Sequence, residues 1–444
     1  MQPGRSVIER AAPRNRLARW QALNLVLLVG GYTGYYLCRS DLSVSMPLLI
    51  AELHRRGMAT GAARLVLGAI ASYGVLAYAI GKFPSGSLAD RFGGKGNFLI
   101  GMAGSIVFTL LFAASGTVPV FTLVWMGNRL VQSLGWAGAV KIVSRWFPFS
   151  RYGAVMGVVS LSFLFGDAAC RQLMALLIAA GFGWRAVFVV AACVLAAVLA
   201  VCAWLIRESP VEIGEAEPSA NPANLFATRT GNTRVGSLRD RLQPFLNSGV
   251  FWLACALSLG TTILRETLTL WTPTYFNQAV GMTPAEAAAA SGLFPFFGGI
   301  SVLVCGWLSD RLKGGGRAAI MTVGLLLAGM TLLALGLGVV PATRTAVVTV
   351  VAAAALLILG PYSFLAGAIS LDFGGKQGSG TASGLIDGIG YMGGVLSGSG
   401  MAQISVRYGW GGAFLILAVF ALLSSLAAGF LLRQIAVSKN YGLR

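Results

Sequence analysis

Charged side chains are scarce in this sequence. Asp, Glu, Lys and Arg make up 11% of its 444 residues, whereas hydrophobic residues make up 56%. Soluble domains carry about 25% charged residues, so this composition excludes a soluble globular protein. A chain of this length has room for about twelve membrane-spanning helices of about 20 residues each. We therefore predict an all-α integral membrane protein with twelve transmembrane helices.

Histidine and paired cysteines are also nearly missing. The only histidine is His54, in a predicted loop, and the six cysteines lie within or at the ends of apolar runs without a Cys-x-x-Cys spacing. These features argue against a disulfide scaffold, a metal centre and histidine-based catalysis. We expect the protein to need no metal and no cofactor.

Acidic residues are outnumbered, with 15 Asp and Glu against 33 Lys and Arg, which gives a net charge of +18. The basic residues gather mainly in alternate loops, which is the positive-inside pattern of a membrane protein. The intervening loops are poorer in them, with the exceptions Arg55, Arg56, Arg64, Arg185, Arg344 and Arg407. We interpret the basicity as topological, and we expect cytoplasmic termini and no nucleic-acid partner.

The apolar runs form two sets of six, separated by one long polar segment. The first set lies at approximately 21–50, 63–88, 96–115, 119–145, 153–180 and 184–206, and the second at approximately 248–277, 284–309, 317–339, 345–371, 378–405 and 410–433. The expected parts are a cytoplasmic arm at 1–19, a six-helix bundle at 20–206, a cytoplasmic linker at 207–247, a second six-helix bundle at 248–433 and a cytoplasmic tail at 434–444.

The two sets repeat one another. Gly-Ser-Leu-Ala-Asp90-Arg91 recurs 220 positions later as Gly-Trp-Leu-Ser-Asp310-Arg311, and further pairs recur at an offset of 226. Several matches at nearly one offset indicate a duplicated six-helix unit. Each Asp-Arg pair follows a predicted span at its cytoplasmic end, where it can bridge neighbouring helices. We predict a gating or structural role for these four residues.

Two arginines, Arg39 and Arg265, interrupt apolar spans at repeat-equivalent positions 226 apart. A cation at this depth costs roughly 2.5–3.5 kcal/mol on insertion scales, so its default interpretation is functional. Repeat symmetry predicts that the two guanidinium groups converge on a central cavity, where they can bind a tetrahedral dianion. Alternatively, each arginine pairs with a local acid, Asp41 or Glu266. Adjacent helical positions point about 100° apart, so we expect Glu266 to be a poor partner for Arg265.

Four further charged residues within predicted spans suggest specific roles. Lys82 either faces the cavity or extends to the cytoplasmic surface. Asp387 is an isolated acid that can carry a proton, pair with a cavity cation or contact a substrate hydroxyl group. Asp167 and Arg171 are four residues apart on one helix, and we interpret them as a structural ion pair.

At these residues the sequence resembles the organophosphate:phosphate antiporter family of the major facilitator superfamily. The resemblance rests on GYTGYYLCRSDLSVSMPLL, YAIGKFPSGSLADR, LRETLTLWTPTYF, the CGWLSD loop and GTASGLIDGIGYMGG, and it extends over nearly all of both halves. It implies two pseudo-symmetric six-helix bundles, and it identifies the Asp-Arg loops as the signature of the superfamily.

The resemblance also implies a substrate site. In this family the arginines at the positions of Arg39 and Arg265 bind the phosphate group. The other family positions that match are Tyr32, Tyr36, Tyr78 and Lys82, and the departures are Ser40 for a second basic residue, Ser162 for a histidine in the pocket and Pro295 for a carboxylate. We therefore include Ser162 in the expected site, and we treat Asp387 as a coupling residue.

The expected function is uptake of an organic phosphate in exchange for inorganic phosphate, by alternating access in a bacterial inner membrane. The expected partners are these two small molecules and the lipid bilayer, and we expect a monomer. No covalent step is needed, so we expect no enzymatic activity. Two alternatives stay open: a proton-coupled symporter of a carboxylate or phosphonate, and a transporter-like membrane sensor.

Overall fold

A computed structural model describes residues 14–148, 151–218, 247–312, 315–365, 369 and 385–440. Within these ranges the regular structure is helical. The first half contains α1 (Arg14–Arg55), α2 (Thr60–Phe92), α3 (Gly94–Ala114), α4 (Val118–Trp146), α5 (Tyr152–Ala179), α6 (Trp184–Leu205) and the short 3₁₀ helix η2 (Pro210–Ile213). The second half contains α8 (Gly249–Gln278), α9 (Pro284–Ser291), α10 (Leu293–Leu312), α11 (Gly316–Gly336), α12 (Arg344–Phe364), a helix at 385–394, η4 (Val395–Ser397) and α14 (Ser399–Asn440).

The helices have the length and apolarity of membrane spans. Eight segments of the described residues qualify on both counts, and one of them, Leu385–Gln434, is 50 residues long. This segment bends at Gly409, which has a φ of 71°, so it supplies two spans. Adding α1, α4 and α8, which have spanning length but carry charged residues in mid-helix, gives the twelve predicted spans. The prediction of an all-α, multi-pass integral membrane protein is confirmed.

Several helix ends differ from the predicted ones. α1 begins at Arg14, inside the predicted arm. The span expected at 284–309 is divided into α9 and α10 at Gly292. Residues 1–13, most of the predicted linker (219–246) and residues 441–444 of the predicted tail lie outside the described ranges. The domain boundaries stay predictions.

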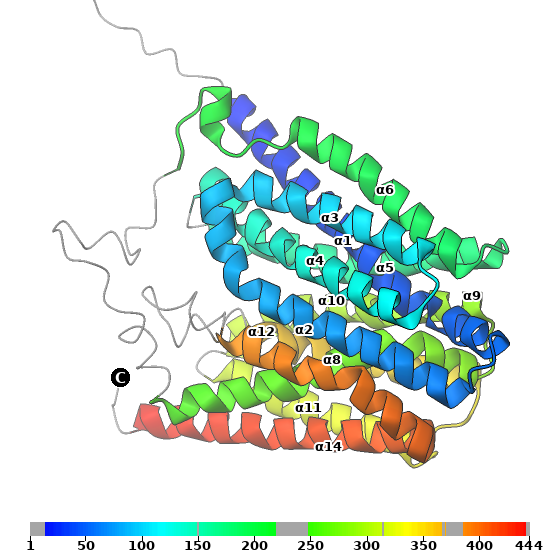
Figure 1. The fold of residues 1–444 in the computed structure, drawn as a ribbon. Helices are drawn as coiled ribbons and strands as arrows, with labels where there is room; N and C mark the ends of the chain where they lie inside the picture. The colour runs from blue at the N-terminus through cyan, green and yellow to red at the C-terminus, as the bar shows by residue number, and fades with distance from the viewer. Residues whose placement is uncertain are drawn as a thin grey trace, which may run out of the picture.

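The helices form two groups. α1 contacts α5 and α6, α3 contacts α4 and α6, and α2 contacts α4, whereas α11 contacts α12 and α14, and α8 contacts α14. Figure 1 shows α3, α4 and α6 in the upper part of the view and α8, α11 and α14 in the lower part, with α2, α9 and α10 at middle height. Contacts between the groups come from α1 with α8, α5 with α9 and α10, and α2 with η4 and α14.

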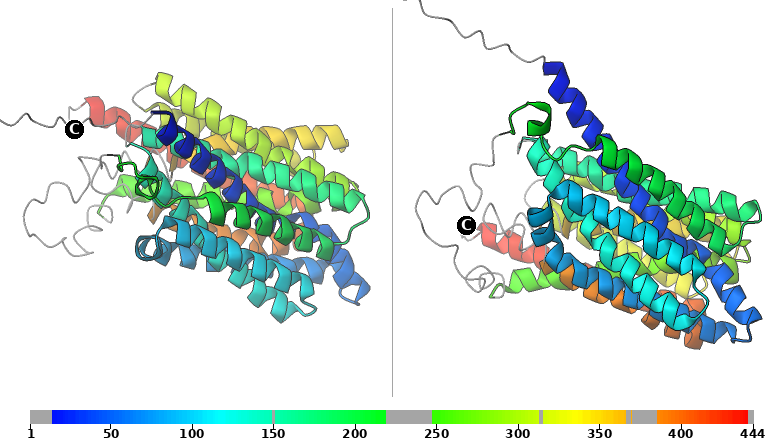
Figure 2. Two further views of the ribbon diagram at one scale, coloured as in Figure 1. Left: turned by 90° about the horizontal axis from the view of Figure 1, so that it is seen from above. Right: turned by 45° about the horizontal axis from the view of Figure 1, so that its top comes forward.

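The two groups meet most closely at one end of the molecule. The Ser399 backbone N–H donates to the Ser72 hydroxyl oxygen at 2.8 Å, and the Gln172 amide donates to the Ala289 carbonyl at 2.7 Å. In Figure 1, and in the right-hand view of Figure 2, the groups spread apart toward the opposite end, where α1 begins and α14 ends. The molecule is thus closed at one end of the helices and splayed at the other.

Two glycines permit the close approach at the closed end. A Cβ added to Gly398 would lie 2.3 Å from the Gly68 carbonyl oxygen, and one added to Gly68 would lie 2.6 Å from the Cβ of Ala402. These contacts leave no room for a larger side chain unless the groups separate.

We expect Gly398→Val to open the closed end, because its side chain would force α2 and α14 apart. With native cysteines replaced, spin labels at Thr60 and Arg407 would report a longer distance by double electron–electron resonance. Gly157→Val is the matched control, since a Cβ at Gly157 meets no atom within 4 Å. An unchanged distance in Gly398→Val would contradict this account of the closure.

Candidate functional site

The site begins at a break in α1. Cys38 has non-helical backbone angles, with φ −85° and ψ 17°. Side chains replace the helical hydrogen bonds there: the Gln132 amide donates to the Cys38 carbonyl at 2.7 Å, and the Leu42 N–H donates to the Asp41 carboxylate at 2.7 Å. The alternative interpretation, a pairing of Arg39 with Asp41, is absent from the described contacts, because this carboxylate accepts a hydrogen bond at the break instead.

Repeat-equivalent residues meet where α1 crosses α8. The Ser43 hydroxyl donates to the carbonyl oxygens of Thr269 and Leu270, at 2.8 Å each. Ser43 and Thr269 are 226 positions apart, so the crossing lies where the repeat symmetry requires it. Arg39 and Arg265 each precede this crossing by four residues, which is about one helical turn.

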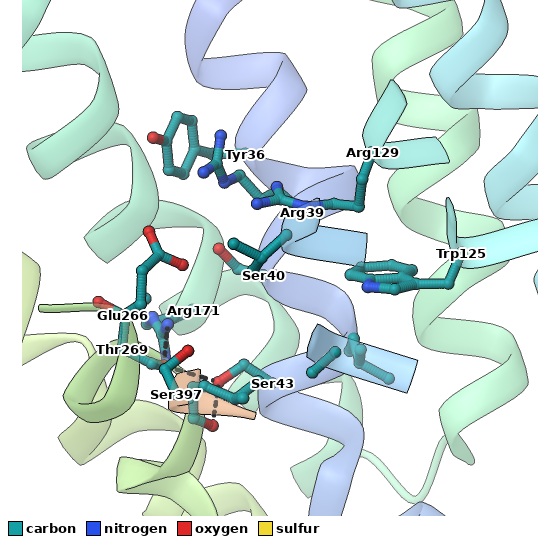
Figure 3. Close-up of a pocket in the computed structure, with 14 residues that line it drawn as sticks. Tyr36, Arg39, Ser40, Ser43, Trp125, Arg129, Arg171, Glu266, Thr269 and Ser397 are labelled. Carbon is teal, nitrogen blue, oxygen red and sulfur yellow. Dashed lines mark hydrogen bonds between the residues drawn. The ribbon is translucent and has the colours of Figure 1, made fainter. Parts of the chain in front are cut away.

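A cavity of about 50 Å³, the space open to the centre of a water-sized sphere, lies beside this crossing. A water molecule needs about 10–15 Å³ by this measure, so the cavity has room for a few waters. It is lined by Tyr36, Arg39, Ser40, Leu42, Ser43, Ala71, Val75, Trp125, Arg129, Arg171, Glu266, Thr269, Leu270 and Ser397, so both helix groups contribute (Figure 3).

Two of the lining arginines share one aromatic partner. The Cζ atoms of Arg39 and Arg129 lie 4.6 and 4.8 Å from the ring centroid of Tyr78, and Arg39 also lies 5.2 Å from the centroid of Tyr36. In Figure 3 the two side chains, from α1 and α4, lie next to each other and extend toward the same side, where Tyr36 lies. The hydrogen bond found for Arg129 goes to the neutral Gln132 side chain at 3.2 Å. Among the described side chains, no carboxylate forms an ion pair with either arginine.

Arg265 is engaged within the second helix group. Its guanidinium donates to the Glu266 carboxylate, and to the Tyr391 hydroxyl at 3.1 Å, while its Cζ lies 4.7 Å from the Tyr362 ring centroid. The expectation that Glu266 is a poor partner was wrong, because both side chains are long enough to bend toward each other although their Cα–Cβ bonds diverge. Glu266 lines the cavity, whereas Arg265 is not among its lining residues.

An ion pair joins the two groups beside the arginines. Lys82 of α2 and Asp387 of the 385–394 helix are 2.6 Å apart, with about a fifth to a quarter of each side chain exposed. The Lys82 Nζ lies 5.2 and 5.0 Å from the ring centroids of Tyr78 and Tyr391. Of the alternatives that the sequence left open, the structure has Lys82 directed to the site and Asp387 paired with a cation.

The second ion pair forms between the two residues on one helix that the sequence singled out, and its structural role stays a prediction. Arg171 lies 3.2 Å from Asp167, and both side chains are at least 97% buried. Arg171 also crosses to the other group, donating to the Ser291 hydroxyl at 3.0 Å and to the Thr269 carbonyl at 2.9 Å. Ser40, adjacent to Arg39, donates to Asp167. This network connects the residue beside Arg39 to the closed end.

The remaining predicted residues lie away from the cavity or outside the described residues. Tyr32 packs on Tyr35, Tyr36 and Trp136 without lining the cavity. The buried Ser162 donates to the Val159 carbonyl of its own helix, so it does not take the predicted place in the cavity.

Of the four residues with a predicted gating role, one has a described side chain. The side chains of Asp90, Arg91 and Asp310 lie outside the described residues. Arg311 is exposed, with its Cζ 4.0 Å from the Trp307 ring centroid. Within the described ranges no group of three His, Cys, Asp or Glu side chains is placed to hold a metal ion.

The sequence interpretation missed four neighbours of the site: Arg129, Glu266 as a cavity residue, Tyr362 and Tyr391. Arg129 stands within the apolar run predicted at 119–145, so the argument that singled out Arg39 applies to it equally. The two tyrosines carry no such signal, because aromatic residues in apolar spans are common.

Comparisons with known proteins give the chain a family. The model for the Major Facilitator Superfamily matches residues 28–398. The glycerol-3-phosphate transporter of Bacillus subtilis is 26% identical over 421 residues, which cover 92% of each chain. The membrane sensor protein UhpC of Salmonella typhimurium is 26% identical over 417 residues, covering 93% of this chain and 91% of that protein.

A solved structure has the same fold. The bacterial homologue of the human lysosomal transporter Spinster, in an inward-facing and unoccupied conformation, aligns with a TM-score of 0.76 at 14% identity, covering 94% of this chain and 98% of that one. The relatives confirm the resemblance to the organophosphate:phosphate antiporters, and a place among transporters rather than enzymes. With a family match over well over half of its length and two groups of membrane-spanning helices, this chain belongs to the Major Facilitator Superfamily.

Proposed function

We propose that this protein takes up an organic phosphate, of the glycerol-3-phosphate or sugar-phosphate type, in exchange for inorganic phosphate. It acts as a monomer in a bacterial inner membrane, with both termini in the cytoplasm. On this orientation the splayed end of the helices faces the cytoplasm, and the closed end faces outward.

The observation that carries the proposal is the surplus of positive charge where the two helix groups meet. The cations of this cluster are Arg39, Lys82, Arg129 and Arg265, and its carboxylates are Glu266 and Asp387. Four positive and two negative charges leave a surplus of two, which matches a phosphate dianion. The fully buried Asp41 adds at most one negative charge, so the cluster stays positive in either of its protonation states.

Binding and transport are coupled through these charges. Because the cations come from both groups, a phosphate bound among them attracts the two groups toward one another. That attraction lowers the barrier to closing the splayed end. The Lys82–Asp387 pair joins the same two groups, so its geometry must change as they move.

A counterflow assay tests the function. Proteoliposomes loaded with inorganic phosphate should accumulate external labelled phosphate, and empty ones should not. Adding internal glycerol-3-phosphate should replace internal phosphate as the counter-substrate. Uptake that follows a pH gradient in phosphate-free vesicles would contradict exchange.

A specific observation supports each alternative. Asp41 is completely buried, and its Oδ2 atom has no hydrogen-bond partner within the described part of the chain, as in a carboxyl group that holds a proton. This feature favours a proton-coupled symporter of an organic anion. The similarity to UhpC favours a sensor, which would bind phosphate compounds without transporting them in the assay above.

A further inference from the structure

Arg129 stands out among the charged groups that the family resemblance does not assign. It is 3% exposed, lines the cavity on the α4 side and stacks on the same tyrosine ring as Arg39. Arg39 and Arg129 lie within range of mutual repulsion, and Tyr78 offers them only partial compensation. Two neighbouring guanidinium groups that form no ion pair with a described carboxylate can bind an anion together.

Glu266 supplies a negative charge to the cavity from the second helix group. Its carboxylate is bonded to Arg265, and it also lies within electrostatic range of Arg39 and Arg129. The positive charge of three guanidinium groups therefore acts on one internal carboxylate, although only Arg265 contacts it. A phosphate with two negative charges can neutralise the positive charge of the three arginines that Glu266 leaves uncompensated. It would also compete with Glu266 for Arg265.

We propose that phosphate first docks between Arg39 and Arg129, within the first helix group, and then draws Arg265 away from Glu266. This inference rests on the proposed function and gives its site a third arginine and an internal competitor. It also gives a physical reason for the order of docking and closure, because Arg265 belongs to the second helix group. Its transfer from Glu266 to the docked phosphate links the two groups only after the anion is present.

Equilibrium binding of labelled inorganic phosphate to the purified full-length protein tests the roles of Arg129 and Glu266. Arg129→Gln should weaken binding by about tenfold to a hundredfold, the effect of losing charge-assisted hydrogen bonds. Arg129→Lys, which keeps the charge without the fork, should lie between that variant and the wild type. Glu266→Gln should tighten binding by about tenfold, because the competing carboxylate is gone.

Arg185→Gln is the matched control. Arg185 also stacks on an aromatic ring, with its Cζ 4.2 Å from the Trp184 centroid, but it does not line the cavity. Melting temperatures of all variants show whether they fold. If Arg129→Gln does not fold, the phosphate affinities of Arg129→Lys and Glu266→Gln test the inference. Wild-type phosphate affinity in the Arg129 variants, or weaker binding in Glu266→Gln, would overturn the inference alone. A wild-type protein that binds no phosphate would instead contradict the proposed function on which it rests.

Discussion

Replacing Arg39 with lysine is expected to reduce phosphate exchange in proteoliposomes by about 100-fold, to near background. The charge is retained, but a lysine cannot form the two parallel hydrogen bonds of a guanidinium fork, and each bond to a charged group is worth about 1.5–3 kcal/mol. Arg39 forms no ion pair among the described side chains, so little of the effect should come from a lost internal contact. Exchange of labelled phosphate measures it.

Arg265→Lys should reduce exchange to the same degree for a further reason. This arginine must leave Glu266 and Tyr391 to reach the substrate, and lysine changes both states. Melting temperatures of both variants should stay close to that of the wild type, and Arg185→Lys should transport normally. If either variant exchanged phosphate at the wild-type rate, Arg39 and Arg265 would not bind the phosphate together as proposed.

Removing the charge of Arg171 is expected to produce the largest loss of stability. Arg171→Met leaves the Asp167 carboxylate buried with the Ser40 hydroxyl as its remaining partner, and removes the bonds to Ser291 and the Thr269 carbonyl. Breaking a buried ion pair by deleting one partner costs about 3–5 kcal/mol. Thermal unfolding in detergent should show a clearly lowered melting temperature.

The double variant Asp167→Asn/Arg171→Met separates charge from packing. Because it removes the uncompensated carboxylate as well, it should recover most of the lost stability. Ser291→Ala, which deletes one neutral contact of the same guanidinium, should have a much smaller effect. A double variant no more stable than Arg171→Met would show that the ion pair is not what makes Arg171 important.

The sequence located the charged residues but not all of their partners. Periodic apolar runs and the two offsets near 220 and 226 were enough to predict twelve spans and the equivalence of Arg39 and Arg265. Ser43 and Thr269, at the same offset, meet at the crossing of α1 and α8. A repeat is visible in the order of residues, so the equivalence of two positions can be predicted from the sequence alone.

Pairing between distant helices required the fold. Lys82 and Asp387 are 305 positions apart, and nothing in their local sequences selects one for the other. Helix geometry alone argues against a pairing of Arg265 with Glu266, but these two long side chains bend toward each other in the fold.

By itself the sequence determined that this is a multi-pass membrane protein built from a repeated unit, with cations at a depth where they must serve a function. Hydrophobic length and the high cost of buried charge are local properties, so they can be read along the chain. Only the tertiary structure decided that Arg129 joins Arg39 at the ring of Tyr78, and that Glu266 holds Arg265. Those contacts depend on how helices from both halves pack around one cavity, and that packing is a property of the whole fold.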